Sequence, residues 1–344
     1  MKISTIGLDL AKNVFAVHGV DEAGHIVVKR NLRRAQVLPF FAKLEPCLVG
    51  MEASSGAHYW ARELSRLGHT AQMMPAGYVK AYVKRGKTDG ADAAANCEAV
   101  SRPTMRFVPV KSVEQQGILA LHRARDVLVR QRTQITNVVR ALCGEFGIVA
   151  AKGKEPLKSL AAIIADDNDG RLGCEARLAL KPLLDQLAQL GGKVALLERE
   201  IVMRHKADPT SKRLASVPGI GPITASALIA SIGDPERFAS GRDLSAWLGL
   251  TPQPHSSGGK HRLGRCSKQG NPYLRRLFVQ GAQSLLYATR RKPNAPSAVW
   301  RQELLARRPV KVAAVAVANK TARIAWSVLV HGGLYRPALL AKAA

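Results

Sequence analysis

The sequence is short of acidic residues. It has 25 Asp and Glu against 52 Lys and Arg in 344 residues, which gives a formal net charge of +27 at pH 7. This excess is far larger than solubility requires, so it favours a polyanionic partner such as nucleic acid over a merely basic soluble protein. The imbalance is strongest after Thr251, where 17 Lys and Arg accompany one acid, Glu303.

Cysteine is also scarce, and its spacing excludes two further classes. The five cysteines are odd in number, and no pair has the Cys-x-x-Cys spacing. We therefore expect neither a disulfide framework nor a zinc site. The cysteine pattern instead indicates a protein of the reducing cytoplasm. Cys47 and Cys97 are expected to be small core residues.

Long apolar runs and a leader are missing as well. No run is expected to reach the length of a membrane-spanning helix, and the N-terminus lacks the pattern of a signal peptide. We therefore expect no membrane partner. Apolar residues nevertheless make up 47% of the chain, enough for two or three folded modules with real cores.

The first hundred residues alternate between strand and helix patterns. Strands are predicted at 3–9, 14–20, 25–29, 47–51 and 70–74, and helices at 35–44, 56–67 and 91–101. The first three strands form a meander, and the strand at 47–51 is fully apolar, as in a covered parallel sheet. This order predicts an RNase H-like α/β fold, with a mixed sheet and helices on its faces.

The middle of the chain is predicted to be helical. Apolar residues recur at helical spacing over 111–147 and 178–204, with a Gly- and Asp-rich connector at 151–175 and an interruption at Gly191-Gly192. Two long helices around a connector favour an antiparallel coiled-coil arm, with a plain helical linker as the alternative. Arg123 and Arg130 lie on the first helix. They either bind successive phosphates of a nucleic acid or belong to an ordinary solvent-exposed helix face. The expected domains are 1–110, 111–208 and a helical domain at 209–344.

Residues 217–221, Val-Pro-Gly-Ile-Gly, join two apolar helical segments. This pattern is typical of a helix-hairpin-helix, in which Gly219 and Gly221 let backbone amides approach a DNA phosphate. A tight connection between helices is the simpler alternative.

A second segment rich in Gly and Ser covers 249–271 and is predicted to be a loop, followed by helices at 272–289 and 310–330. Ser257 directly precedes Gly258, which leaves its hydroxyl sterically open. Four cations accompany it and suit a phosphate: Lys260, Arg262, Arg265 and Lys268. An ordinary basic DNA-binding loop is the alternative.

Four carboxylates are predicted to meet in the N-terminal fold. Asp9 and Glu52 end neighbouring strands, and Asp89 and Asp92 lie one turn apart at the start of a helix. Each helix residue alone is explained by helix capping. Together the four would repel one another unless cations lay between them, and oxygen ligands suit Mg²⁺ or Mn²⁺. Two such ions would serve phosphodiester chemistry.

These motifs resemble those of the DEDD transposases, the insertion-sequence recombinases related to the Piv invertases. The N-terminal half carries Gly7-Leu8-Asp9, Gly50-Met51-Glu52-Ala53-Ser54 and residues 87–92, which resemble their RuvC-like domain. The C-terminal half resembles their second domain at 217–221, 247–252, 256–260, 270–276 and 319–326. The resemblance spans essentially the whole chain.

The resemblance implies a mechanism and partners. Asp9, Glu52, Asp89 and Asp92 would hold Mg²⁺, and Ser257, preferred over Ser256, would attack DNA to give a covalent phosphoserine. It also implies a homo-oligomer, a dimer or tetramer in which one protomer's serine meets another's acids. Donor and target DNA would be selected by a structured guide (bridge) RNA, in a bacterial cytoplasm and on the nucleoid when bound.

Further nucleic-acid contacts are predicted at basic positions outside the serine segment: Lys87, Arg275, Arg276, Lys320 and Arg323. Three other functions compete with the recombinase. They are a RuvC-like two-metal Holliday-junction nuclease that uses water, a non-catalytic nucleic-acid-binding module, and a sugar-kinase-like ATPase. The last leaves the charge unexplained and lacks a second phosphate loop.

Overall fold

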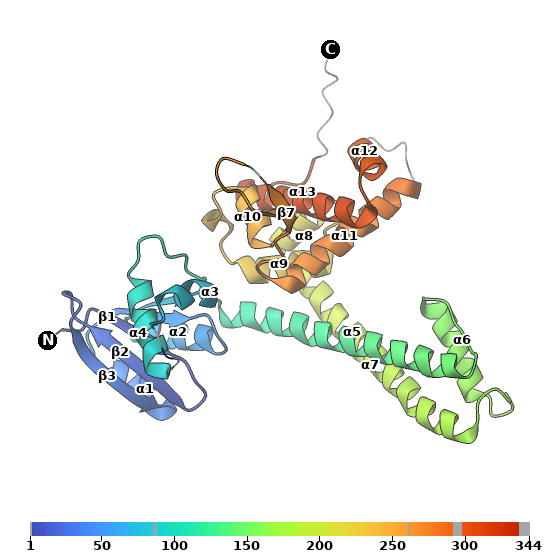
Figure 1. The fold of residues 1–344 in the computed structure, drawn as a ribbon, viewed down its shortest axis with the longest axis horizontal. Helices are drawn as coiled ribbons and strands as arrows, with labels where there is room; N and C mark the ends of the chain where they lie inside the picture. The colour runs from blue at the N-terminus through green and yellow to red at the C-terminus, as the bar shows by residue number, and fades with distance from the viewer. Residues whose placement is uncertain (1, 85, 87, 261, 292–297, 337–344) are drawn as a thin grey trace, which may run out of the picture. The chain divides into compact units, whose positions relative to one another are not determined.

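The computed structural model describes residues 2–84, 86, 88–260, 262–291 and 298–336. Contacts between Cα atoms divide the chain into two units, Met1–Val113 and Glu114–Ala344 (Figure 1). The separation of a helical arm at residue 208 remains a prediction, because the arm helices and the C-terminal helices belong to the same unit.

Unit 1 is built on a five-stranded mixed sheet with the strand order β3-β2-β1-β4-β5. Its strands are β1 Thr5–Asp9, β2 Val14–Val20, β3 Ile26–Arg33, β4 Leu48–Glu52 and β5 Thr70–Met74. β2 and β3 are antiparallel, whereas β1, β4 and β5 are parallel. This arrangement is compatible with the predicted RNase H-like fold.

Helices cover both faces of this sheet. They are α1 Val37–Phe41, α2 Ala57–Arg66, α3 Ala76–Val79 and α4 Asp89–Val100, with short 3₁₀ turns at Arg34–Gln36 and Lys80–Tyr82. Ile6 and Leu8 of β1 pack in a buried cluster with Phe41 of α1 and Trp60 of α2. The intervening Gly7 contacts α4, because successive strand residues face opposite sides.

Unit 2 begins with three helices that pack together: α5 Val113–Glu145, α6 Lys154–Ala165 and α7 Cys174–Ala207. Val139 of α5, Leu160 of α6 and Leu180 of α7 share one buried cluster. Two predictions were wrong here. The connector contains α6, and α7 continues through Gly191-Gly192, because Leu190 and Val194 on either side are buried.

The rest of unit 2 is a helical core with one small hairpin. Its elements are α8 Pro209–Ala215, α9 Pro222–Ile232, a 3₁₀ turn Pro235–Arg237, α10 Gly241–Trp247, β6 Pro252–Pro254, β7 Leu263–Cys266, α11 Pro272–Arg291, α12 Val299–Arg307 and α13 Val310–His331. A single cluster of buried apolar residues joins α8 to α13. The hairpin corrects the predicted loop, and α12 was not predicted.

α13 also corrects the expectation that no run reaches spanning length. By length and composition alone it could cross a membrane. In the structure it packs in the helical core, with Ala313, Ala314, Val317, Ala322 and Ala325 buried. Its apolar composition is therefore explained by its place in the core of unit 2.

Candidate active site

Asp9 and Glu52 end the two central parallel strands of unit 1. β1 and β4 pair with Gly7 beside Gly50 and Leu8 beside Met51, so Asp9 and Glu52 occupy the next position of the same register. Both carboxylates follow a glycine by two residues, so they lie on the same face of the sheet as those glycines. That face is the one covered by α4.

The two glycines allow α4 to lie unusually close to the sheet. A methyl group on Gly7 would overlap the carbonyl oxygen of Ala93 and the amide nitrogen of Cys97. A methyl group on Gly50 would lie 2.7 Å from the carbonyl oxygen of Asn96. No side chain larger than hydrogen fits at either position without moving the helix.

Buried contacts fix the position of α4 along β1. Asn96 donates a hydrogen bond from Nδ2 to the carbonyl oxygen of Leu8 (3.1 Å), and Cys97 donates from Sγ to that of Thr5 (3.7 Å). The helix residue that is further along the chain thus contacts the earlier strand residue. α4 therefore runs opposite to β1, and its N-terminus lies at the strand end that carries Asp9.

Asp89 is the first residue of α4, and Asp92 lies one turn further. Thr88 caps the helix, since its hydroxyl accepts a hydrogen bond from the amide of Ala91 (3.2 Å). The capping role that could have explained both acids therefore belongs to Thr88. The favourable helix dipole still stabilises negative charge here.

The four carboxylates interact electrostatically. The pKa of Asp9 is raised to about 6, first by burial and then by the negative charges of Asp92, Asp89 and Glu52, in that order. A backbone hydrogen bond from Leu10 opposes the shift. The fold thus places Glu52, Asp89 and Asp92 within electrostatic range of Asp9.

Residues of this kind suit a divalent cation. Among the described residues, no ion pair involves any of the four acids, although salt bridges are frequent elsewhere in the chain. Clustered oxygen ligands without a neutralising side chain fit a hard cation such as Mg²⁺ or Mn²⁺. As placed, the described side chains include no group of three or more acids, His or Cys close enough to hold one ion. Shared ligation therefore requires these carboxylates to move closer together.

Ser257 lies at the tip of the β6–β7 hairpin in unit 2. It pairs with Lys260 across a turn whose two central residues, Gly258 and Gly259, have φ of 55° and 75°. Two positive φ values define a type I′ turn, which glycine adopts without strain. The turn therefore explains the glycine pair and leaves Ser257 exposed.

The two adjacent serines differ in their contacts. The hydroxyl of Ser256 accepts a hydrogen bond from the amide of Arg262 (3.2 Å) and so helps to close the hairpin. The hydroxyl of Ser257 has no hydrogen-bond partner among the described residues. The hydroxyl of Ser257 is therefore the less constrained of the two among the described contacts.

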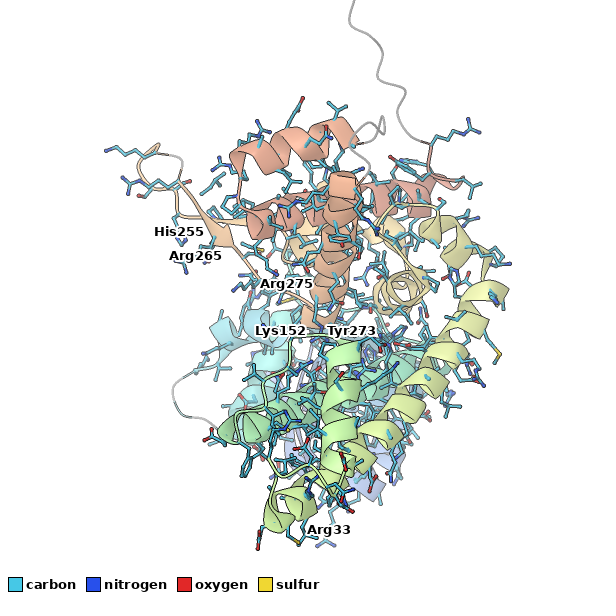
Figure 2. The ribbon with its side chains drawn as sticks, turned by 90° about the vertical axis from the view of Figure 1, so that its right-hand side faces the viewer. Arg33, Lys152, His255, Arg265, Tyr273 and Arg275 are labelled. Carbon is cyan, nitrogen blue, oxygen red and sulfur yellow. The ribbon has the colours of Figure 1, made fainter. Side chains whose placement is uncertain are left out.

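The basic residues predicted to bind nucleic acid divide into two groups. Several already have structural partners. Arg275 donates to the carbonyl oxygens of Leu248 and Gln269, and Arg276 and Arg130 both pair with Asp126. Lys260, Arg262, Arg265, Lys268, Arg123 and Arg323 are exposed and make no side-chain ion pair within the described residues, and Lys320 lies over the ring of Trp300. Figure 2 shows Arg265 on the hairpin and Arg275 on α11. Lys87 lies outside the described residues.

The Pro-Gly-x-Gly turn joins α8 and α9 as predicted, but its glycines differ. Gly219 has φ of 87°, and a Cβ there would lie 2.9 Å from Cδ1 of Leu285, whereas a Cβ on Gly281 of α11 would overlap the carbonyl oxygen of Gly219. Gly221 is exposed, with nothing near its missing side chain. Gly219 is therefore explained by helix packing, and only Gly221 is open to a phosphate.

Sequence reasoning missed the residues that seat α4: Gly7, Gly50 and Asn96. A signal for two of them is present, because Gly-x-acid occurs at the end of both central strands, as Gly7-Leu8-Asp9 and Gly50-Met51-Glu52. Nothing in the sequence pointed to Asn96, a buried polar residue in an Ala-rich helix.

Comparison with known families agrees with this arrangement. A DEDD transposase model of the IS110 group, described as "Transposase", matches residues 6–146 and so includes all four acids. A second model, "Transposase IS116/IS110/IS902 family", matches residues 211–297 and includes Ser257. The chain is thus a DNA transposase of an insertion sequence, an enzyme of DNA recombination, and membership in a DEDD family implies use of a divalent metal ion.

Full-length relatives define the family more closely. The "Probable family 20 transposase" of Pseudomonas aeruginosa is 50% identical over 98% of this chain and 100% of its own length. The transposase for IS1328 of Yersinia enterocolitica is 40% identical over 97% of this chain and 98% of its own. That for IS1111A of Coxiella burnetii is 39% identical over 97% and 92%. The chain belongs to the IS110 family of transposases.

Proposed function

We propose that this transposase cuts and rejoins DNA through Ser257, with Mg²⁺ or Mn²⁺, two ions in all, held by Asp9, Glu52, Asp89 and Asp92. The observation that carries the proposal is that β1 and β4 end side by side in Asp9 and Glu52, at the strand end where α4 begins with Asp89 and Asp92. The exposed, unpartnered hydroxyl of Ser257 supports the choice of nucleophile. Both sets of residues lie within regions matched by transposase models.

The reaction is two transesterifications. The Oγ of Ser257 forms a bond to the phosphorus of a DNA phosphodiester, and one P–O bond to the departing strand breaks. Serine loses a proton, and the departing strand gains one on its new hydroxyl. A second DNA hydroxyl then attacks the phosphoserine, which restores the serine and joins the strands. The number of ester bonds is conserved, so no external energy source is needed.

The residues of the chain divide the work. Ser257 supplies the nucleophile from a rigid two-glycine turn, and the cations of the same hairpin attract the phosphate. Asp9, Glu52, Asp89 and Asp92 would hold the metal, which would supply positive charge that favours the serine alkoxide and offsets the charge developing on the phosphate. Asp9 must be ionised for this role, and the raised pKa of its carboxyl, about 6 without metal, means that a proton competes with the cation at lower pH.

The same proposal includes a guide RNA and an oligomer. A net charge of +27 favours the binding of both RNA and DNA, and the family resemblance implies that a structured RNA chooses the target. Purified protein that recombines its cognate DNA without bound RNA would contradict the RNA guide. A monomer active at high dilution would contradict the exchange of sites between protomers.

Trapping a covalent protein–DNA adduct tests the nucleophile. Ser257→Ala should abolish the adduct and strand exchange, whereas Ser256→Ala, the matched control, should retain the adduct at reduced yield because only the hairpin closure is weakened. Asp9→Asn should abolish both activities. Cleavage by Ser257→Ala without an adduct would instead identify a RuvC-like nuclease that uses water. If neither Ser257→Ala nor Asp9→Asn changed activity on DNA, the chain would act as a binding module.

A further inference from the structure

A large groove lies in unit 2 beside the hairpin that carries Ser257. Its volume is about 1530 Å³, and it is lined by residues of β6, β7, α10 and α13, together with Trp300 of α12. Sites for small molecules are typically about 300–1,000 Å³, so this space is larger than one drug-sized ligand needs. Its size suits a segment of a polymer.

The walls of the groove are strongly basic. Its lining includes six cations: Arg242, Arg265, Lys268, Lys311, Lys320 and Arg323. No carboxylate is among the described residues that line it, and none of the six cations makes a side-chain ion pair or hydrogen bond to a described residue. Lys320 lies 4.2 Å from the ring centroid of Trp300, a cation–π contact that holds its ammonium group in place. Such uncompensated charge fits a polyanion.

Lys268 is held at the groove by an uncommon backbone conformation. Its φ is 53°, a region that residues other than glycine seldom adopt. Its amide donates to the carbonyl oxygen of Gly249 (3.2 Å), which fixes the end of the hairpin against the turn after α10. The backbone of Lys268 is therefore held in place at the edge of the groove.

The lining of the groove also includes apolar side chains. Val312, Val315, Ala316 and Ile324 of α13 contribute to it, and Val312 is 53% exposed. A duplex presents mainly phosphates to a protein surface and would leave these apolar side chains unused. An unpaired strand presents phosphates and apolar base faces together, which is the combination that single-strand binding grooves accommodate.

We propose that this groove binds an unpaired DNA strand, the one whose phosphodiester Ser257 attacks. The choice of DNA rests on the proposed function, because Arg265 and Cys266 of the groove wall belong to the same hairpin as Ser257. A strand that lies along this wall continues towards the hairpin tip. RNA is the alternative occupant that the experiment must exclude.

Binding of short oligonucleotides to the full-length protein tests this assignment. The groove variant combines Lys311→Gln with Arg323→Gln, and its matched control combines Lys152→Gln with Lys193→Gln, two exposed lysines on the arm. Both are made in a Ser257→Ala background, so that chemistry does not follow binding. Fluorescence anisotropy is measured with oligo-dT, oligo-rU and a dT·dA duplex over a range of salt.

The salt slope is the slope of log affinity against log salt concentration. Loss of two phosphate contacts should reduce its magnitude for oligo-dT by about 1.4. At about 0.1 M salt the groove variant should therefore bind roughly 25-fold more weakly than the parent protein, if the two bind equally at about 1 M. The control should leave that slope unchanged, and the duplex should be less affected than oligo-dT. An equal loss in the groove variant and the control overturns the proposal, and so does a loss confined to oligo-rU. Thermal melting of both variants shows that folding is intact.

A second measurement connects the groove to Ser257. In the wild-type serine background, the groove variant should reduce adduct formation in step with its loss of oligo-dT binding. Normal adduct formation despite lost binding means that the attacked strand takes another path, and the inference fails. If Ser257→Ala retains the adduct while groove binding persists, the proposed nucleophile fails and the groove remains.

Discussion

Gly7 of β1 lies directly opposite Gly50 of β4, and the missing side chains of this pair make the surface on which α4 rests. Two residues further along each strand come Asp9 and Glu52. The close approach of the helix and the nearness of its N-terminus to Asp9 and Glu52 therefore have one origin. Each Gly-x-acid motif places the helix and provides one acid on the same face.

Gly7→Ala is expected to displace α4 and to weaken the acidic cluster. The new methyl group would overlap backbone atoms of Ala93 and Cys97, so the helix must shift, at a cost of about 1–3 kcal/mol or more. A lower Tm and weaker Mn²⁺ binding by calorimetry would show this. Gly77→Ala is the matched control, because nothing lies near its missing side chain. Unchanged metal binding by Gly7→Ala would contradict the seating role.

Asp9 makes the metal affinity and the stability depend on pH in opposite senses. Its folded pKa of about 6 lies above its ordinary value of 3.8. The proton it retains stabilises the metal-free fold fully below pH 3.8, and this contribution is lost as the pH rises through 6. Metal binding requires the ionised form, so the apparent affinity should fall about tenfold per pH unit below 6.

Asp9→Asn separates these two effects. At pH 8 in EDTA the variant should be more stable than the wild type, by about 1 kcal/mol after allowance for solvent screening of this half-exposed group. The advantage should vanish at pH 4 and reverse when Mg²⁺ is added, because the metal stabilises only the wild type. Melting curves in EDTA and in Mg²⁺ measure this. Equal Tm values for the two proteins in EDTA at pH 8 would argue against a strained acid cluster.

His122 is expected to make unit 2 sensitive to acid. It is buried between the hydroxyls of Tyr273 (3.1 Å) and Ser226 (3.2 Å), and it links α5 to α9 and α11. Burial, with a smaller contribution from Arg125, lowers its pKa from 6.5 to about 4. The neutral ring therefore contributes stability that is present above pH 6.5 and lost as the pH falls through 4.

His122→Gln should remove that dependence, which amounts to about 3 kcal/mol between pH 6.5 and 4. The wild type should lose stability over this range, and the variant, although less stable at pH 7, should lose less. His255→Gln, an exposed histidine on the hairpin, is the control and should follow the wild type. Parallel curves for His122→Gln and the wild type would exclude a buried neutral imidazole. Urea denaturation at a series of pH values provides these curves.

The two glycines after Pro218 should respond differently to substitution. Gly219→Ala adds a methyl group 2.9 Å from Cδ1 of Leu285 at a positive φ, so unit 2 should lose about 1–3 kcal/mol. Gly221→Ala meets no neighbour and should change stability by less than about 0.5 kcal/mol. Any loss of DNA binding by Gly221→Ala at unchanged Tm would mark a phosphate contact. If Gly219→Ala left the Tm unchanged, the packing explanation would be wrong.

Much of unit 1 was predictable because its strands are short apolar runs with clear boundaries, and β5 occupies the predicted residues 70–74. α6 was missed because the Gly and Asp residues on both sides obscured the apolar stretch within it. The β6–β7 hairpin was missed because its residues are exposed, so no apolar alternation indicates its strands. Gly191-Gly192 suggested a break, but burial of the neighbouring residues keeps α7 continuous.

The candidate site shows a similar limit. The order of the four acids along the chain predicted that they would meet. The structure places the other three within electrostatic range of Asp9, but no three of the described acids are close enough to hold one ion. The reason for their closeness was not predictable from secondary-structure propensity. It depends on the packing of α4 against Gly7 and Gly50, two sheet positions without side chains. The partner of Arg276, Asp126, was likewise hidden, since it lies 150 residues away in the sequence.

All four acids stand at the ends of regular elements, two where strands finish and two where α4 begins. Their spacing is therefore set by the sheet and the helix that rests on it, and not by the turns between them. The segments that follow β1, β4 and β5 can accordingly gain or lose residues while the carboxylates stay in place. Evolution can thus remodel the rim of this site freely while its chemistry is preserved.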